Sequence, residues 1–577
     1  SSDLCLDNEV FAAVKSLYDQ KKHLDLTKEQ STVLENHYKD FVRNGALLSE
    51  EDKEKLREID QTLSKLSLKF SENMRKASNE YSLIVDDKSR LKGLPENVIA
   101  TAFEAAKEKG HEGKYVFTLD YPSYVPLMTY CEDRELRKEL WTARQTYVSA
   151  GKFDNRQVII DILKFRKKRA QLLGYKDHPS FVLEERMAQN PENVMDFIKD
   201  LSDKCLDFAK KDIEKVRTLK HELTNDSELT SFDFSFYAEK LKKKELDFDT
   251  EELRPYFKLE NVLEGAFLVA QKLFGIKFEP RDDLPVYHQD VKVFEVTDDN
   301  GEFIGLFYGD YFPRKEKRSG AWMTTYRQSG LQFGEVKRPI VTNVCNLTKP
   351  SKDKPSLLSL DEVRTIFHEL GHGLHGLLSK TKYKSVSGTN VHWDFVELPS
   401  QVMENWLNEK ECLDLFAKHY ETGETIPAEL VKKIASSGQF MEGYGCMRQM
   451  RFASLDMAWH LVDPDSIDDV KAYEEKAIEK FDLLDDPKVG VTSCSFGHIF
   501  AGGYSSGYYS YKWAEVLDAD AFAYFKEKGI FNKEIGLKFR KEVLEKGGSE
   551  PPMDLYINFR GQKPSVDALM QRSGFTN

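Results

Sequence analysis

The sequence lacks several features that would assign the chain to a specialised class. It has seven cysteines, and none of them forms a Cys-x-x-Cys pair. An odd, scattered set predicts neither a disulfide framework nor a cysteine zinc site, and it favours a reducing compartment. No apolar run reaches the roughly 18 residues of a membrane-spanning helix. The starting segment SSDLCLDNEV also lacks the basic and apolar regions of a secretory signal.

An excess of positive charge is missing as well. Lysine and arginine number 84 against 97 acidic residues, which gives a net charge of −13. Because nucleic-acid surfaces need a basic field, this balance argues against one. A solvated acidic surface is the simplest interpretation, and attraction of cationic peptides is the alternative. We expect a cytoplasmic monomer with no nucleic-acid or membrane partner; a periplasmic or exported protein whose signal was removed is the alternative.

Helical periodicity dominates what is present. Between Leu56 and Ala77, apolar residues recur at steps of three and four, and Ser49 is the predicted cap of this long helix. Core packing is the simplest interpretation of such stripes. Further helices are predicted at 95–109, 133–149, 155–173, 191–222, 259–274, 447–461, 466–481 and 532–546.

One region departs from the helical pattern. Alternating apolar segments at 291–297 and 303–311 flank an Asn-Gly pair, which is a strong hairpin signal. Residues 321–327 and 339–343 are predicted as further strands. A small sheet is therefore expected before residue 345 in an otherwise helical chain. No linker rich in proline, glycine or serine marks a domain boundary.

The segment HELGH carries the clearest chemical signal, and it lies in a predicted helix at 360–379. His368 and His372 are four residues apart, so they share a helix face and can hold one metal ion. Glu369 is placed to act as general base on a metal-bound water, which is the zincin arrangement. A chance match is the alternative, and the helical context argues against it.

A third metal ligand is required, and spacing alone does not identify it. His375 lies about 10 Å from His368 along a helix, which is too far for one metal ion. The longer metzincin motif also fails, because its last histidine position is Leu378. Glu397 and Glu404 lie seven residues apart on one face of a predicted helix. Either could bind the metal while the other orients a ligand histidine, and solvated helix charges are the alternative interpretation.

The segment 496–513 combines glycines with tyrosines. Gly502 and Gly503 lie where the backbone is expected to bend or to approach a ligand. The tyrosines that follow are predicted to continue at helical spacing, and tyrosine hydroxyls can donate to the oxyanion of a tetrahedral intermediate. Aromatic core packing is the alternative. The candidate side chains are His498, Tyr504, Tyr508 and Tyr511.

Together these segments resemble the thimet-oligopeptidase family of zinc peptidases. The matching stretches are FHELGHGLH at 367–375, SGTNVHWDFVELPSQ at 387–401, FGHIFAGGYSSGYYSYKW at 496–513 and GGSEPPMDLYINFRG at 547–561. Within the family the chain is most similar to bacterial peptidyl-dipeptidases and oligopeptidase A, because HIFAGGY is one residue longer than the thimet form. The resemblance also begins inside the family pattern, so an upstream helical segment is expected to be missing.

The resemblance implies a mainly α-helical, zincin-like fold in which two helical halves flank a deep substrate channel. One zinc ion per chain would lie at the channel floor, so that only short peptides enter. The implied domains are a helical channel wall at 1–255 and a zinc catalytic domain at 256–577, with the small sheet near 291–344 lining the cleft.

The resemblance also implies roles for individual residues. It completes the metal ligands His368 and His372 with Glu397, and it leaves Glu404 to support a ligand. Glu369 is the implied catalytic base. The residues implied to stabilise the transition state or contact substrate are Tyr511, Tyr508, His498, Tyr504, Gly502 and Gly503.

We therefore expect a zinc metallopeptidase that releases C-terminal dipeptides from short peptides. An endo-acting, oligopeptidase A-like enzyme is the alternative, because the sequence does not identify the group that would capture a C-terminal carboxylate. A non-catalytic peptide-binding protein with a structural zinc is the remote alternative. Glu369 argues against it, since a structural site has no use for a base.

Overall fold

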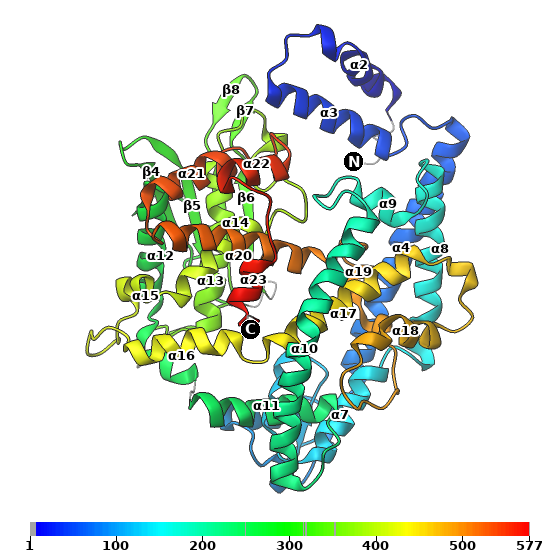
Figure 1. Cartoon of the computed structure of the whole chain (residues 1–577), viewed down its shortest axis with the longest axis vertical. Coiled ribbons are helices and arrows are strands. Elements are labelled where there is room, and N and C mark those ends of the chain that lie inside the picture. The colour runs from blue at the N-terminus through cyan, green and yellow to red at the C-terminus, as the bar shows by residue number, and fades with distance from the viewer. Residues whose placement is uncertain (1–6, 248–249, 315–316, 318–319, 351–353, 576–577) are drawn as a thin grey trace. The chain divides into compact units, whose positions relative to one another are not determined.

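The computed structural model describes residues 7–247, 250–314, 317, 320–350 and 354–575. It confirms the prediction of a mainly helical chain with a small sheet (Figure 1). In the part of the chain it describes, no helix has the length and apolar character needed to cross a bilayer. Cys5 lies outside the described residues.

The chain divides into two compact units, each discontinuous in sequence. The first comprises Ser1–Leu47, Phe248–Gln439 and Ser510–Asn577, and the second comprises Leu48–Asp247 and Phe440–Tyr509. This division differs from the single boundary expected between 255 and 256. The difference arises because the N-terminal helical segment packs within the first unit, whereas a late segment packs within the second.

The second unit is built from long amphipathic helices. In α4, the Ser49 hydroxyl accepts the N–H of Asp52 as the predicted cap, and Leu56 and Phe70 from the apolar stripe are buried. Helix α4 packs on α8, and α10 packs along α17 (Figure 1). Its helices are α4 (Glu50–Glu80), α5 (Glu96–Glu108), α6 (Tyr121–Tyr130), α7 (Arg134–Thr146), α8 (Arg156–Leu172), α9 (His178–Leu183), α10 (Pro191–Thr224), α11 (Ser231–Leu246), α17 (Glu442–Leu461), α18 (Val470–Ile478) and α19 (Gly497–Phe500); β1 (Leu83–Val85) pairs with β2 (Tyr115–Phe117).

A buried carboxylate joins three helices of this unit. Asp233, on α11, is fully buried and forms ion pairs with Arg134 at 2.8 Å, Arg137 at 2.9 Å and Lys220 at 3.0 Å. Burial alone would raise the pKa of Asp233, but hydrogen bonds from these cations outweigh burial and lower it. Asp233 therefore ties α7 and α10 to α11 as an ion.

Asp233→Asn is expected to lower the free energy of unfolding by about 3–5 kcal/mol, because it leaves buried cations without their counter-charge. The lowered pKa means that this stabilisation is present above the unfolded-state pKa of about 3.9 and is lost as pH falls through the folded-state value. Thermal unfolding would measure it. Asp226→Asn is the matched control, since that half-exposed partner of Lys220 contributes at most about 1 kcal/mol; equal losses would contradict the assignment.

The first unit holds the sheet. Its order is β3-β4-β5-β9-β6, with β5 parallel to β9 and the other neighbours antiparallel. The predicted hairpin is confirmed, and Gly301 takes a positive φ of 80° in its turn. The strands are β3 (Ile276–Pro280), β4 (Lys292–Asp298), β5 (Phe303–Asp310), β6 (Trp322–Arg327) and β9 (Ile340–Val344); β7 (Gly330–Gln332) pairs separately with β8 (Glu335–Lys337).

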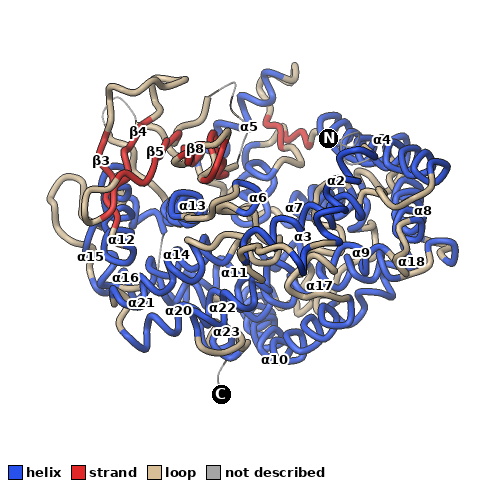
Figure 2. Tube along the Cα trace, turned by 90° about the horizontal axis from the view of Figure 1, so that it is seen from above, coloured by secondary structure: helices blue, strands red, loops and turns tan. Residues whose placement is uncertain are grey.

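Helices of the first unit cover this sheet and extend beyond it. Helix α13 lies along the sheet, where its glycines approach β5, β6 and β9 (Figure 2). The helices are α2 (Asn8–Asp19), α3 (Lys28–Arg43), α12 (Leu259–Phe274), α13 (Leu360–Leu378), α14 (Leu398–Glu404), α15 (Lys410–Phe416), α16 (Ala428–Gln439), α20 (Ser510–Lys528), α21 (Lys533–Phe539), α22 (Pro552–Arg560) and α23 (Asp567–Arg572).

Candidate metal centre and active site

The helix that carries HELGH is α13, and its start is fixed by a capping box. The Ser359 hydroxyl accepts the N–H of Glu362 at 3.2 Å, and the Glu362 carboxylate accepts the N–H of Ser359 at 2.7 Å. These two bonds satisfy backbone donors that a helix start leaves free. The helix then runs unbroken past His368 and His372, which places both rings on one face.

Gly371, inside the motif, allows α14 to approach α13. A Cβ at this position would lie 2.5 Å from the Pro399 carbonyl oxygen and 2.5 Å from Ser400 Cα. Any larger residue would therefore push the two helices apart. This close approach brings Glu397, at the N-cap position of α14, toward the histidines of α13.

Three side chains converge on a common point. Glu397 Oε2 lies 3.3 Å from His368 Nε2 and 3.2 Å from His372 Nε2, and one ligand atom from each residue falls within 4.8 Å of the others. A tetrahedral ion with bonds of about 2.05 Å separates its ligand atoms by about 3.3 Å. The donor set and its spacing therefore fit a single metal ion. The Ser400 hydroxyl fixes Glu397 by donating to Oε2 at 2.8 Å.

Glu404 supports the site from outside the ligand cluster. Its Oε1 lies 2.7 Å from His368 Nδ1, so that Nδ1–H donates to it and Nε2 is left to face the centre. Burial would lower the pKa of His368, but hydrogen bonds with Glu397 and Glu404 raise it to about 10. Hydrogen bonds with His368 and His372 hold the pKa of Glu397 below its ordinary value, although burial alone would raise it. Metal binding therefore competes with a proton on His368.

Glu369 is suited to moving a proton. It is 5% exposed, and its Oε2 has no hydrogen-bond partner among the described residues. Burial raises the pKa of Glu369, although the neighbouring His368 and His372 oppose that shift. It also borders a cavity of about 10 Å³, which is close to the space of one water. A buried carboxylate with a raised pKa and an unpartnered oxygen is suited to take up and return a proton during catalysis.

His375 lies outside the metal cluster. Its ring is fully buried, and neither ring nitrogen has a hydrogen-bond partner in the described part of the chain. Burial lowers its pKa to about 3, so the ring is neutral.

The tyrosine and glycine segment adopts a different structure from the one expected. Helix α20 begins only at Ser510, so Tyr511 is helical, whereas Tyr504 and Tyr508 lie in the preceding turns. The prediction of a continuous helical spacing is therefore wrong, because Ser506 takes a positive φ of 53° that no helix accommodates. Gly502 and Gly503 lie in the bend after α19, as their density suggested.

Three of these candidates form one aromatic cluster in the second unit. The His498 ring lies 5.8 Å from Tyr504 and 5.6 Å from Tyr508, measured between ring centroids. Tyr508 also contacts Phe496 and Phe452. Burial raises the pKa of Tyr508, so its hydroxyl keeps its proton and can donate. Tyr511 belongs to the first unit, like the metal ligands.

Asp456 holds this turn, and sequence reasoning missed it. The fully buried carboxylate accepts the backbone N–H groups of Ser506 at 2.8 Å, Gly507 at 2.9 Å and Tyr508 at 3.0 Å. The only signal in the sequence was an aspartate between Leu455 and Met457 in a predicted helix. Its neighbour His460 continues the network, with Nδ1 at 2.9 Å from Asp456 Oδ1.

Comparison with known proteins assigns the chain to a family. The model of peptidase family M3 matches residues 127–575. Oligopeptidase A of Escherichia coli K12 is 39% identical over 98% of this chain and 84% of its own length. Dipeptidyl carboxypeptidase of the same organism is 36% identical over 100% of this chain and 85% of its own. The chain therefore belongs to peptidase family M3.

Membership of this family makes the chain a metallopeptidase, and the alternative of a non-catalytic peptide-binding protein is set aside. Solved structures share the fold at low identity. A structure titled PZ peptidase A with inhibitor 2 has a TM-score of 0.54 at 16% identity, covering 98% of this chain and 82% of that one. Oligoendopeptidase-F from Enterococcus faecium has a TM-score of 0.52 at 12% identity, covering 100% and 81%.

Proposed function

We propose that the metal is zinc, held by His368, His372 and Glu397. Two imidazoles and one carboxylate are a typical catalytic zinc set, which keeps a fourth position open. Bound there, zinc would supply Lewis acidity to the substrate carbonyl and lower the pKa of a water. The observation that carries the proposal is the position of Glu397 Oε2, 3.2–3.3 Å from both imidazole nitrogens, next to the buried Glu369.

The protein's own groups then have separable tasks. Glu369 takes a proton from the attacking water and returns it to the leaving amine. Glu404 keeps the His368 ring in the tautomer and orientation that metal binding needs. Tyr511 and Tyr508 donate hydrogen bonds to the developing oxyanion. We further propose that His498, Tyr504 and the backbone at Gly502 and Gly503 contact the peptide, on the strength of family membership and of the clustered rings.

Tyr508→Phe is expected to lower kcat by roughly 10²-fold or more, because one donor to the oxyanion is lost. The KM should change little, because this donor binds the neutral carbonyl of the ground state more weakly than the oxyanion of the transition state. Steady-state kinetics on a fluorogenic peptide would measure both. Tyr524→Phe, on the far part of α20, is the control; a loss as large in the control, or none in Tyr508→Phe, would contradict this role.

For specificity we propose release of C-terminal dipeptides from short peptides, with internal cleavage as the alternative. Each has support in a relative's name: one relative is called dipeptidyl carboxypeptidase and another oligopeptidase A. Dipeptide release needs a cation or other donor that captures the substrate's free carboxylate, whereas internal cleavage does not.

A time course on a nonapeptide separates the two specificities. Mass spectrometry should show dipeptides leaving in succession from the C-terminus, and C-terminal amidation should slow the first cut. One internal cut, equally fast on the free acid and the amide, would establish the endo-acting alternative. A folded protein of similar composition should resist cleavage in either case.

We propose a cytoplasmic monomer. A relative from Arabidopsis thaliana, 37% identical, is named probable cytosolic oligopeptidase A, while another is named organellar, chloroplastic/mitochondrial. Cell fractionation and light scattering of the purified protein test the two parts of this proposal separately.

A further inference from the structure

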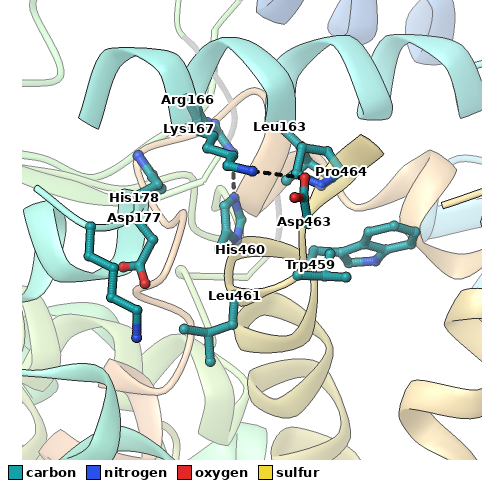
Figure 3. A pocket seen from close by; sticks show the side chains of 12 residues that line it. Leu163, Arg166, Lys167, Asp177, His178, Trp459, His460, Leu461, Asp463 and Pro464 are labelled. Atoms are coloured by element: carbon teal, nitrogen blue, oxygen red, sulfur yellow. Dashed lines mark hydrogen bonds and ion pairs between the residues drawn. The ribbon is translucent and has the colours of Figure 1, made fainter. Parts of the chain in front are cut away.

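A pocket of about 150 Å³ lies in the second unit, and none of the residues of the aromatic cluster line it (Figure 3). Helix α8, the start of α9 and the end of α17 line it. Its arginine, lysine and histidine side chains are Arg166, Lys167, Lys176, His178 and His460. We propose that this pocket binds a small oxyanion, of the phosphate or carboxylate type, on the guanidinium of Arg166.

Arg166 is the side chain that we expect to bind the anion. It is 8% exposed, and its Nη1 donates to the Ile499 carbonyl oxygen at 2.7 Å and lies 2.7 Å from His460 Nε2. Among the described residues its Nε and Nη2 have no protein acceptor, and no carboxylate pairs with it directly. Burial lowers its pKa to about 10, so it still carries its charge at neutral pH. A buried cation without a carboxylate is costly, and a planar guanidinium binds oxyanions through two parallel N–H groups.

The acidic groups of the pocket are already engaged. The Asp177 carboxylate accepts the N–H of Ser180 at 2.8 Å and caps α9. Asp463 pairs with Lys167 at 2.8 Å, the contact drawn in Figure 3. Lys176 is exposed and forms no ion pair in the described part of the chain. The pocket therefore keeps a cationic surplus.

His460 connects Arg166 to the segment that holds Tyr508. Its Nδ1 lies 2.8 Å from the Asp456 carbonyl oxygen and 2.9 Å from the Asp456 carboxylate, so Nδ1–H donates and Nε2 accepts from Arg166 (Figure 3). Asp456 interacts electrostatically with Arg166, but its oxygens already accept three backbone N–H groups. A bound anion would place a negative charge beside Arg166, because the Asp456 carboxylate is already shared among those three backbone donors.

The space suits a small oxyanion. One water needs roughly 10–15 Å³ measured in the same way. A cavity of about 150 Å³ therefore holds a phosphate or a short carboxylate with part of its hydration shell. His178, whose Nε2 lies 3.0 Å from the Ser505 hydroxyl, adds a neutral ring. Its pKa is held well below the ordinary value by burial and by the nearby Arg166.

Thermal unfolding of the purified, metal-loaded protein with inorganic phosphate as the probe tests the site. Phosphate should raise Tm saturably by ~2 °C or more above sodium chloride of equal ionic strength. Acetate in a parallel titration represents the carboxylate class; a saturable response to either anion supports the site and identifies the preferred ligand. This measurement does not depend on peptidase activity, so its failure and the failure of the proposed function can be told apart.

Three variants locate the anion. Arg166→Gln should abolish the response. Lys176→Met should weaken the apparent affinity severalfold, and because Lys176 is exposed this change should not affect folding. His368→Ala should keep the response, because the metal site is elsewhere. Absence of any response in the wild type, a full response in folded Arg166→Gln protein, or loss of the response in His368→Ala would each overturn the proposal. If Arg166→Gln does not fold, the other two variants test the site. A weakened response in Lys176→Met together with an unchanged response in His368→Ala supports it, and a full response in Lys176→Met overturns it.

Discussion

Replacing Glu369 by glutamine is expected to lower kcat by roughly 10³-fold while the bound metal stays at one equivalent. Glutamine keeps the shape and burial of the side chain but cannot take a proton from the attacking water, and such positioned groups typically contribute 10²–10⁴-fold. Metal analysis and steady-state kinetics on the same preparation would measure both quantities.

Glu411→Gln makes the same chemical change on an exposed residue of α15 and should leave kcat unchanged. Normal turnover of Glu369→Gln with full metal content would remove Glu369 from the mechanism. Loss of metal together with activity would give Glu369 a structural role at the metal site instead of a catalytic one.

Replacing Glu397 by glutamine is expected to cost the protein its metal and with it all peptidase activity. Glu397 Oε2 is the atom that lies 3.2–3.3 Å from both imidazole nitrogens, so its removal leaves two ligands. Glu404→Gln is the matched variant, seven residues along the same helix. It should weaken metal affinity only about 10–100-fold, the usual effect of losing a group that orients a ligand histidine.

Competition with a chromophoric chelator would measure both affinities. Equal losses in the two variants would contradict the division of roles. A larger loss in Glu404→Gln would exchange them, with Glu404 as ligand and Glu397 as its support.

The metal helix could be predicted from the sequence because its signals are local. Histidines four residues apart, an adjacent glutamate and helical periodicity all fall within a few turns of α13. The hairpin of β4 and β5 was predictable for the same reason, since the Asn-Gly turn lies between two alternating segments. Strand β3 was missed because it follows α12 directly, and Ile276 is its only buried residue.

The third ligand could not be chosen by spacing, because Glu397 and Glu404 share one helix face. What separates them is the tertiary contact at Gly371, where α14 comes close enough to α13 for Glu397 to reach both rings. The glycine was visible in the sequence, but the backbone that it faces was not. Family resemblance chose Glu397, and the geometry gives a physical reason for that choice.

Asp456 and the two compact units show the limit of sequence reasoning in another way. Asp456 accepts backbone N–H groups about 50 residues further along the chain, and no periodicity encodes a partner so distant. The units likewise combine segments that are far apart in sequence. No linker rich in proline, glycine or serine marks the points where the chain crosses between them, and the single boundary implied by the resemblance treats each domain as one continuous stretch.

Peptide hydrolysis before and after removal of the metal tests the central claim most directly. The purified protein should cleave a short fluorogenic peptide, lose that activity when a chelator strips the metal, and regain it with one equivalent of zinc per chain. Hydrolysis that continues at full rate in the stripped protein, or a protein that holds one zinc on His368, His372 and Glu397 and cleaves no peptide, would contradict it.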